Sequence, residues 1–156
     1  MDDLLSALQA MPFAQYLRTA RWGYAVLNTA HVLGIALLVG AILPLDLRLL
    51  GFWPRIPRDD LSRILVPVAV AGLVLAAATG PLLFAMRAEE YAALGVFRAK
   101  LVFIALGIAG ALTLHRAYGL SLIGASERRV AAHAAISIVC WIGALVCGRF
   151  IAFVLE

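Results

Sequence analysis

Four apolar runs, each long enough to cross a lipid bilayer, dominate the pattern of hydrophobic and polar positions along this chain. A transmembrane helix needs about 20 consecutive, mostly apolar residues. The runs cover about residues 22–43, 65–86, 97–118 and 130–155. Because the connections between them are short, sequential helices are expected to pack antiparallel. The pattern therefore predicts an all-α integral membrane protein, an antiparallel four-transmembrane-helix bundle that forms one membrane domain over residues 1–156.

A shorter amphipathic segment precedes the first run. Leu4, Leu8 and Met11 fall on one helical face, and Pro12 then interrupts the pattern. We expect residues 1–17 to form a short N-terminal helix that lies in the membrane interface. A helix that binds a protein partner is the alternative interpretation.

Composition supports the membrane class and sets a preferred orientation. Only 14% of the residues are charged, against roughly a quarter in soluble domains. The net charge of +4 does not indicate a nucleic-acid partner, because the basic residues lie at the ends of the apolar runs, as topology and headgroup contacts require. The connections after the first and third runs carry seven of them: Arg48, Arg55, Arg58, Arg63, Arg116, Arg128 and Arg129. The opposite side carries six: Arg18, Arg21, Arg87, Arg98, Lys100 and Arg149. The positive-inside rule thus places both termini outside the cytoplasm.

The three histidines of the chain, His31, His115 and His133, all lie inside apolar runs. An ionisable side chain at membrane depth is costly and usually marks a functional site facing the bundle interior. At 1.5 Å per residue, His31 lies about 14 Å and His115 about 27 Å below the same face, and His133 lies near the level of His115. Depth therefore favours His115 with His133 as the two axial ligands of one haem. The alternative is that each histidine only hydrogen-bonds a neighbouring helix.

Three basic residues are candidates for anion binding. Arg48 follows Asp46 by two positions at the end of the first run, so the two side chains point in different directions on a helix. Arg149 lies within the last apolar run, and Lys100 opens the third. An arginine in such a run either reaches the surface or pairs with an anion, for which a haem propionate or a lipid headgroup is suitable.

The fourth run also carries a regular series of small and polar residues. The spacing of four, three, four and three places them along one helical face, as expected of a packing seam. A path for Cu(I) through the thiols is the alternative, because thiolates suit that ion. The series consists of His133, Ser137, Cys140, Ala144 and Cys147.

Several motifs resemble, in order and over nearly the whole chain, an uncharacterised family of small four-helix bacterial membrane proteins. The resemblance implies a multi-pass protein of the bacterial inner membrane, for which the positive-inside rule places the termini in the periplasm. The motifs are His31–Gly40, Asp46–Gly51, Thr79-Gly80, Phe97–Leu101, Leu114–Arg116, Trp141–Gly143 and Gly148–Phe153.

A looser similarity extends to the HemJ-type protoporphyrinogen oxidases and the CopD-type copper-resistance membrane domains. It rests on the order of His31, Arg48, Lys100 and His115. HemJ-type proteins are similar to b-type haem proteins, so the resemblance implies a tetrapyrrole site held by His31 and His115. The first helix departs from that pattern, because it ends in Pro44-Leu45-Asp46-Leu47-Arg48.

Together these features predict a membrane-embedded haem b protein, in electron transfer or tetrapyrrole redox chemistry. Its partners would be the lipid bilayer and a quinone or a redox subunit, it could oligomerise, and any enzymatic activity would be that of a membrane oxidoreductase. The alternatives are a non-catalytic accessory membrane subunit and a copper-handling membrane protein. The expected haem-binding residues are His31, His115, His133, Arg48, Lys100 and Arg149.

Overall fold

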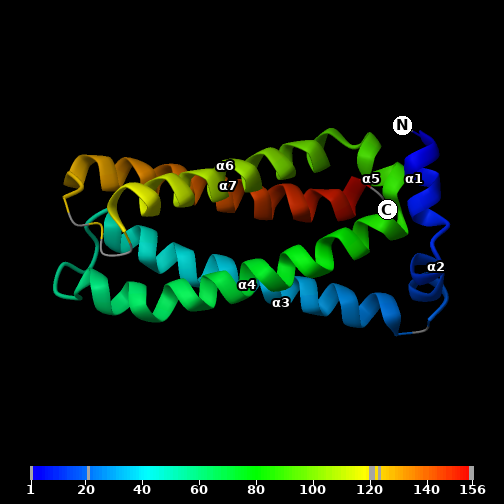
Figure 1. Ribbon diagram of the computed structural model, residues 1–156, viewed down its shortest axis with the longest axis horizontal. Helices are drawn as coiled ribbons and strands as arrows, with labels where there is room; N and C mark the ends of the chain where they lie inside the picture. The colour runs from blue at the N-terminus through cyan, green and yellow to red at the C-terminus, as the bar shows by residue number, and fades with distance from the viewer. Residues whose placement is uncertain (1, 21, 120–121, 123, 155–156) are drawn as a thin grey trace.

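The protein is an all-helical bundle, as Figure 1 shows. The computed structural model describes residues 2–20, 22–119, 122 and 124–154. Its helices are α1 (Asp2–Gln9), α2 (Pro12–Thr19), α3 (Gly23–Leu49), α4 (Arg58–Met86), α5 (Ala88–Ala93), α6 (Gly95–Tyr118) and α7 (Glu127–Val154). The four long helices are apolar enough to cross a membrane. The predicted fold class is therefore confirmed.

The spanning helices extend beyond the apolar runs that predicted them. The helix α3 continues through Pro44 to Leu49, and α4 begins at Arg58 with Asp59 and Asp60 in its first turn. Acidic residues there interact favourably with the helix dipole, so a helix can begin in the polar interface before its apolar run. Hydropathy detects only the part of each helix that meets hydrocarbon. Leu155, the predicted end of the fourth span, lies outside the described residues.

The bundle is built from two antiparallel pairs, α3 with α4 and α6 with α7, joined through α3 and α7. The first pair meets at glycines: a Cβ added at Gly34 would lie 2.7 Å from the Ala76 nitrogen, and one at Gly72 would lie 2.5 Å from the Leu38 nitrogen. Membrane helices associate largely through such close backbone approach. Packing therefore runs in the order α4, α3, α7, α6, and the two outer helices make at most slight contact with each other.

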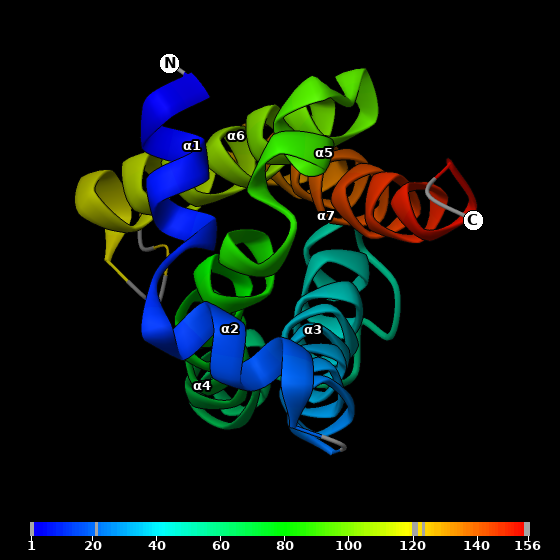
Figure 2. The ribbon, with the colours of Figure 1, turned by 90° about the vertical axis from the view of Figure 1, so that its right-hand side faces the viewer.

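The N-terminal segment lies across one end of the bundle (Figures 1 and 2). It forms two helices instead of the one predicted over 1–17, because Pro12 begins a new helix, α2. The helix α1 contacts α5, a short helix that the sequence did not predict, and the Ser6 hydroxyl donates to the Glu89 carboxylate at 2.8 Å. Met1, the side chain of Arg18 and all of Arg21 lie outside what is described.

Candidate functional site

A partly open cavity of about 270 Å³ lies between the spans, toward the end of the bundle opposite α1 and α2. All four spans line it, and it occupies the space where α4 and α6 do not pack against each other. Most of its lining is aliphatic. Its polar and aromatic lining residues are Asp46, Ser62, His115, His133, Ser137 and Trp141. A mostly apolar cavity with a few convergent polar groups is the usual form of a ligand site.

Asp46 is the unsatisfied group of this cavity. Its side chain is on α3, and the residue is only 5% exposed. The Ser137 hydroxyl on α7 donates a hydrogen bond to the carboxyl group. The oxygen Oδ2, however, is buried and accepts no hydrogen bond from any residue that the structure describes. Because an unpaired buried acceptor costs about 1–3 kcal/mol, such an atom in a cavity is a strong indication of a ligand-binding role.

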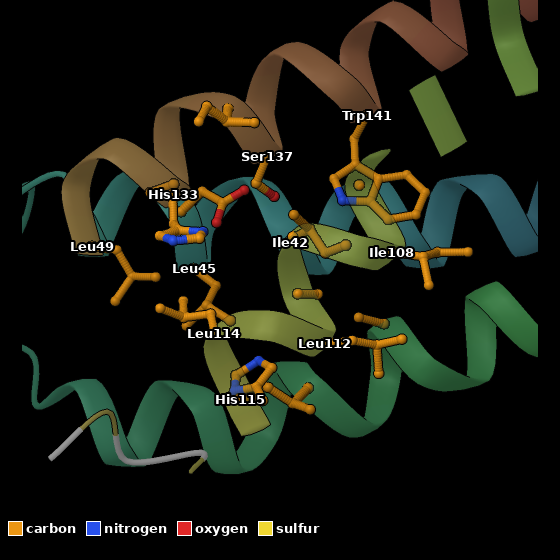
Figure 3. Close-up of a pocket in the computed structure, with 18 of the residues that line it drawn as sticks. Ile42, Leu45, Leu49, Ile108, Leu112, Leu114, His115, His133, Ser137 and Trp141 are labelled. Carbon is orange, nitrogen blue, oxygen red and sulfur yellow. The ribbon is translucent and has the colours of Figure 1, made fainter. Parts of the chain in front are cut away.

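Two of the three histidines share this cavity. His115 comes from α6 and His133 from α7, and Figure 3 shows both with Leu45 and Leu114 between them in that view. The Gly119 carbonyl lies 3.3 Å from Nδ1 of His115 and can only accept, so Nδ1 carries the proton. In the neutral ring, Nε2 then keeps its lone pair. Metal-ligating histidines commonly have this arrangement, with the other ring nitrogen donating to a carbonyl.

His31 lies elsewhere, in a group that we call the N-terminal polar cluster: His31, Thr79 and Lys100. The Thr79 hydroxyl donates to the Leu75 carbonyl at 2.7 Å, so its oxygen accepts from Nδ1 of His31 at 2.9 Å. Lys100, on α6, lies at a similar level and places its Nζ beside Gly148 of α7. The structure thus does not bring His31 to the cavity of His115 and His133.

Helix register explains this separation. Measured from the end where α3 and α6 begin, His31 lies about 12 Å along α3, whereas His115 lies about 30 Å along α6. The antiparallel α7 places His133, 21 residues before Val154, about 32 Å from the same end. The depth estimate from the sequence also groups His115 with His133. The HemJ-type resemblance implies the pair His31 and His115, and the structure does not bring these two histidines together.

The candidate anion-binding residues also separate. Arg48 is buried and directed at the α3–α4 connection, where its guanidinium donates to the carbonyls of Ile56 at 2.6 Å and Pro54 at 3.2 Å. Asp46, two residues earlier, faces the cavity. The two side chains thus point in different directions, as the helical spacing predicts. Arg149 is exposed at the other end of the bundle, with its guanidinium 4.6 Å from the centre of the Phe153 ring.

Arg48 therefore stabilises a turn. We expect Arg48→Met to destabilise the protein by about 1.5 kcal/mol, because hydrogen bonds from a charged donor contribute about 1.5–3 kcal/mol and this connection is exposed. Thermal unfolding in detergent measures the effect. Arg55→Met, in the same connection but exposed, is the matched control and should change little. Equal behaviour of the two variants would contradict the role assigned to Arg48.

Sequence reasoning did not assign Asp46, Ser137 or Trp141 to the site. Signals for two of them exist: Asp46 is the acid at the end of an apolar run, and Ser137 follows His133 by one helical turn. Trp141 belongs to the Trp141–Gly143 motif, but that motif gives no reason to place it in a cavity. It is buried because Gly107 leaves room for it, with a Cβ there lying 3.1 Å from the indole.

Among the described residues, no group of three or more His, Cys, Asp or Glu side chains is arranged to hold a metal ion. Both cysteines are free. Haem needs only one or two protein ligands, because the porphyrin supplies the others. The donor set of the cavity, two imidazoles and an unpartnered carboxyl oxygen in apolar surroundings, is compatible with that cofactor.

The fold and its four apolar helices define a multi-pass membrane protein associated with the lipid bilayer. Comparisons with protein-family models, with curated proteins and with solved structures find no match. The argument for function therefore rests on the cavity and its residues.

Proposed function

We propose that this protein binds haem b in the cavity between its four spans, where His115 and His133 would hold the iron, and transfers electrons in the membrane. The observation that carries the proposal is that histidines from two adjacent helices line one largely apolar, partly open cavity. When bound, haem supplies one-electron redox chemistry, whose potential depends on axial ligation, burial and nearby charge.

The residues of the chain would perform three tasks. His115 is held in one tautomer by the Gly119 carbonyl, so Nε2 is the available ligand atom. The aliphatic lining excludes water, which strengthens electrostatic interactions inside the site. Asp46 places a carboxyl group in the same space, where it would interact favourably with positive charge.

The volume of the cavity implies that the helices must move to admit haem. The cavity of about 270 Å³ is slightly smaller than typical ligand pockets of about 300–1,000 Å³, so α4 and α6 must move apart to admit a porphyrin. These helices pack mainly on α3 and α7. Their separation would therefore break few contacts.

An absorption spectrum of the purified protein, oxidised and dithionite-reduced, tests the proposal. We expect a Soret band and sharp reduced α and β bands in the wild type. His115→Ala and His133→Ala should each weaken haem binding about tenfold or more, because second-shell changes alone commonly cost 10–100-fold. His31→Ala is the matched control and should keep the spectrum, because His31 lies outside the cavity. A protein that stays colourless after haem is added, or unchanged spectra in both cavity variants, would exclude this site.

A second candidate is a non-catalytic accessory membrane subunit. The bond between His31 and Thr79 favours it, because it joins α3 to α4 and satisfies the histidine without any ligand. Interhelical hydrogen bonds of this kind stabilise membrane bundles by about 0.6 kcal/mol on average. Failure of the wild type to take up haem would favour this candidate.

A further inference from the structure

The cavity between the four spans has a polar end and an apolar end. Apart from Trp141, its polar lining side chains all lie within about 15 Å of the end of the bundle where α4 and α7 begin. Leu73 of α4, Leu106 of α6 and Trp141 of α7 line it about 18–23 Å from that end, near the middle of their spans. This gradient matches an amphiphile whose headgroup lies near the membrane interface and whose chain points toward the centre of the bilayer.

The cavity opens between α4 and α6, which make at most slight contact with each other and lie apart in Figure 2. Its exposed lining side chains include Val70 of α4 and Leu106 of α6, each 53% exposed, whereas Asp46 of α3 and Trp141 of α7 are each 5% exposed. Val70 and Leu106 both lie about 18 Å from the polar end, a level inside the hydrocarbon core of a bilayer. A ligand therefore reaches this opening from the membrane, and a chain that extends out of it remains in lipid.

Asp46 determines the kind of headgroup that the polar end can bind. Its Oδ2 accepts no hydrogen bond from a described residue, and the ion pairs found in the described part of the chain do not include it. No lysine or arginine is among the described residues that line the cavity. The nearest cation along α3, Arg48, donates to carbonyls of the α3–α4 connection instead. Because buried charges in proteins are normally paired, this carboxyl group favours a cationic ligand.

An organic ammonium suits this position better than a metal ion. A hard cation such as Ca²⁺ takes about six to eight oxygen ligands, and no group of three or more His, Cys, Asp or Glu side chains is arranged for a metal within the described ranges. A primary ammonium has three N–H donors, which suit Oδ2 of Asp46 and the hydroxyl oxygen of Ser137. A phosphate beside the ammonium would meet no described cationic side chain in the cavity. A simple amine is therefore favoured over an aminophospholipid.

We propose that this cavity binds an amphiphilic amine from the bilayer, with its ammonium group against Asp46 and Ser137 and its apolar chain directed past Trp141 toward the opening between α4 and α6. The inference does not rest on haem binding. Because a cavity of about 270 Å³ cannot hold both ligands, amine and haem exclude each other. The amine would therefore regulate haem uptake.

Fluorescence of Trp141 tests the site in the full chain without haem. Trp22→Phe and Trp53→Phe, both at exposed positions, leave Trp141 as the only tryptophan. Trp141 lies about 16 Å from Asp46 along the bundle, so a bromine at the end of a dodecyl chain should reach the indole and quench it. In a nonionic detergent, we expect ω-bromododecylamine to quench at a concentration at least tenfold lower than ω-bromododecanol or ω-bromododecanoate.

The other outcomes of this titration are equally specific. Equal quenching by the alcohol would show that only the chain is recognised and would overturn the proposal, as would no quenching by the amine. A further probe, ω-bromododecylphosphoethanolamine, carries the same ammonium beside a phosphate. Weaker quenching by this probe identifies a simple amine as the ligand, and quenching as strong as that by the amine identifies an aminophospholipid.

Variants assign the headgroup to Asp46. Asp46→Asn keeps the size of the side chain and removes its charge, so it should weaken amine binding about tenfold or more and leave binding of the alcohol unchanged. Asp60→Asn, exposed at the start of α4, is the matched control. Unchanged amine binding in Asp46→Asn would overturn the assignment. The haem spectrum is recorded in a separate sample without amine, so failure of the amine site and failure of the proposed haem site are distinguishable.

A second pair of variants tests the route. Val70→Phe narrows the opening between α4 and α6 and should slow quenching by the amine. Val74→Phe, one helical turn further along α4, is also exposed but does not line the cavity, and it should leave the rate unchanged. Equal rates for the two variants would contradict entry between α4 and α6.

Discussion

Gly72→Ala is expected to destabilise the bundle by roughly 3 kcal/mol or more. The added methyl carbon would lie 2.5 Å from the Leu38 nitrogen and 2.6 Å from the Gly34 carbonyl oxygen. Both are backbone atoms, so no side-chain rotation relieves the clash and α3 must move away from α4. Overpacking commonly costs 1–3 kcal/mol, and here it also separates the most extensively packed pair of helices.

Thermal unfolding in detergent measures this effect. A thiol-reactive fluorescent dye reports it, because Cys140 is only 3% exposed and reacts on unfolding. Gly40→Ala on α3 is the matched control: a Cβ there has no atom within 4 Å, and alanine is the better helix former. Gly34→Ala should reproduce the loss. Because both glycines serve one contact, the double variant should lose less than the sum of the two. If Gly72→Ala unfolds at the temperature of Gly40→Ala, the close contact between α3 and α4 is wrong.

Asp46→Leu is expected to stabilise the protein, by about 1–2 kcal/mol. No described residue hydrogen-bonds the buried Oδ2, and burial of a carboxyl oxygen without a partner costs free energy that an apolar side chain of similar size does not. Loss of the Ser137 hydrogen bond offsets part of the gain. A residue whose removal raises stability is one that the fold does not require, which is typical of functional sites.

The same unfolding assay tests this prediction. Asp60→Leu is the matched control, because Asp60 is exposed at the start of α4, where its replacement removes only a favourable interaction with the helix dipole. A lower unfolding temperature for Asp46→Leu would show that the carboxyl group stabilises the fold. In that case Asp46 would be structural, and the cavity would lose its main indication of a ligand.

Particular residues show how far sequence reasoning reaches. The grouping of His115 with His133 follows from helix length and direction alone, because position along a helix converts directly into depth. The opposite directions of Asp46 and Arg48 follow in the same way from a spacing of two. The hydrogen-bond partners of Asp46 and Arg48 cannot be predicted from the spacing. That Arg48 meets the carbonyls of its own connection, and Asp46 meets Ser137, depends on how the chain turns and which helix lies alongside.

By itself, the sequence determined the membrane class, the four spans and the level of each polar residue, because bilayer thickness and helical rise relate number of residues to depth. Only the tertiary structure decided that α3 packs on α7 and that α4 and α6, although consecutive spans, do not pack extensively on each other. Pairing of α3 with α7 leaves α4 and α6 apart and creates the cavity, and close backbone contact at Gly34 and Gly72 fixes α3 on α4. Lateral packing depends on the shapes of whole helix faces, and hydropathy along the chain does not encode them.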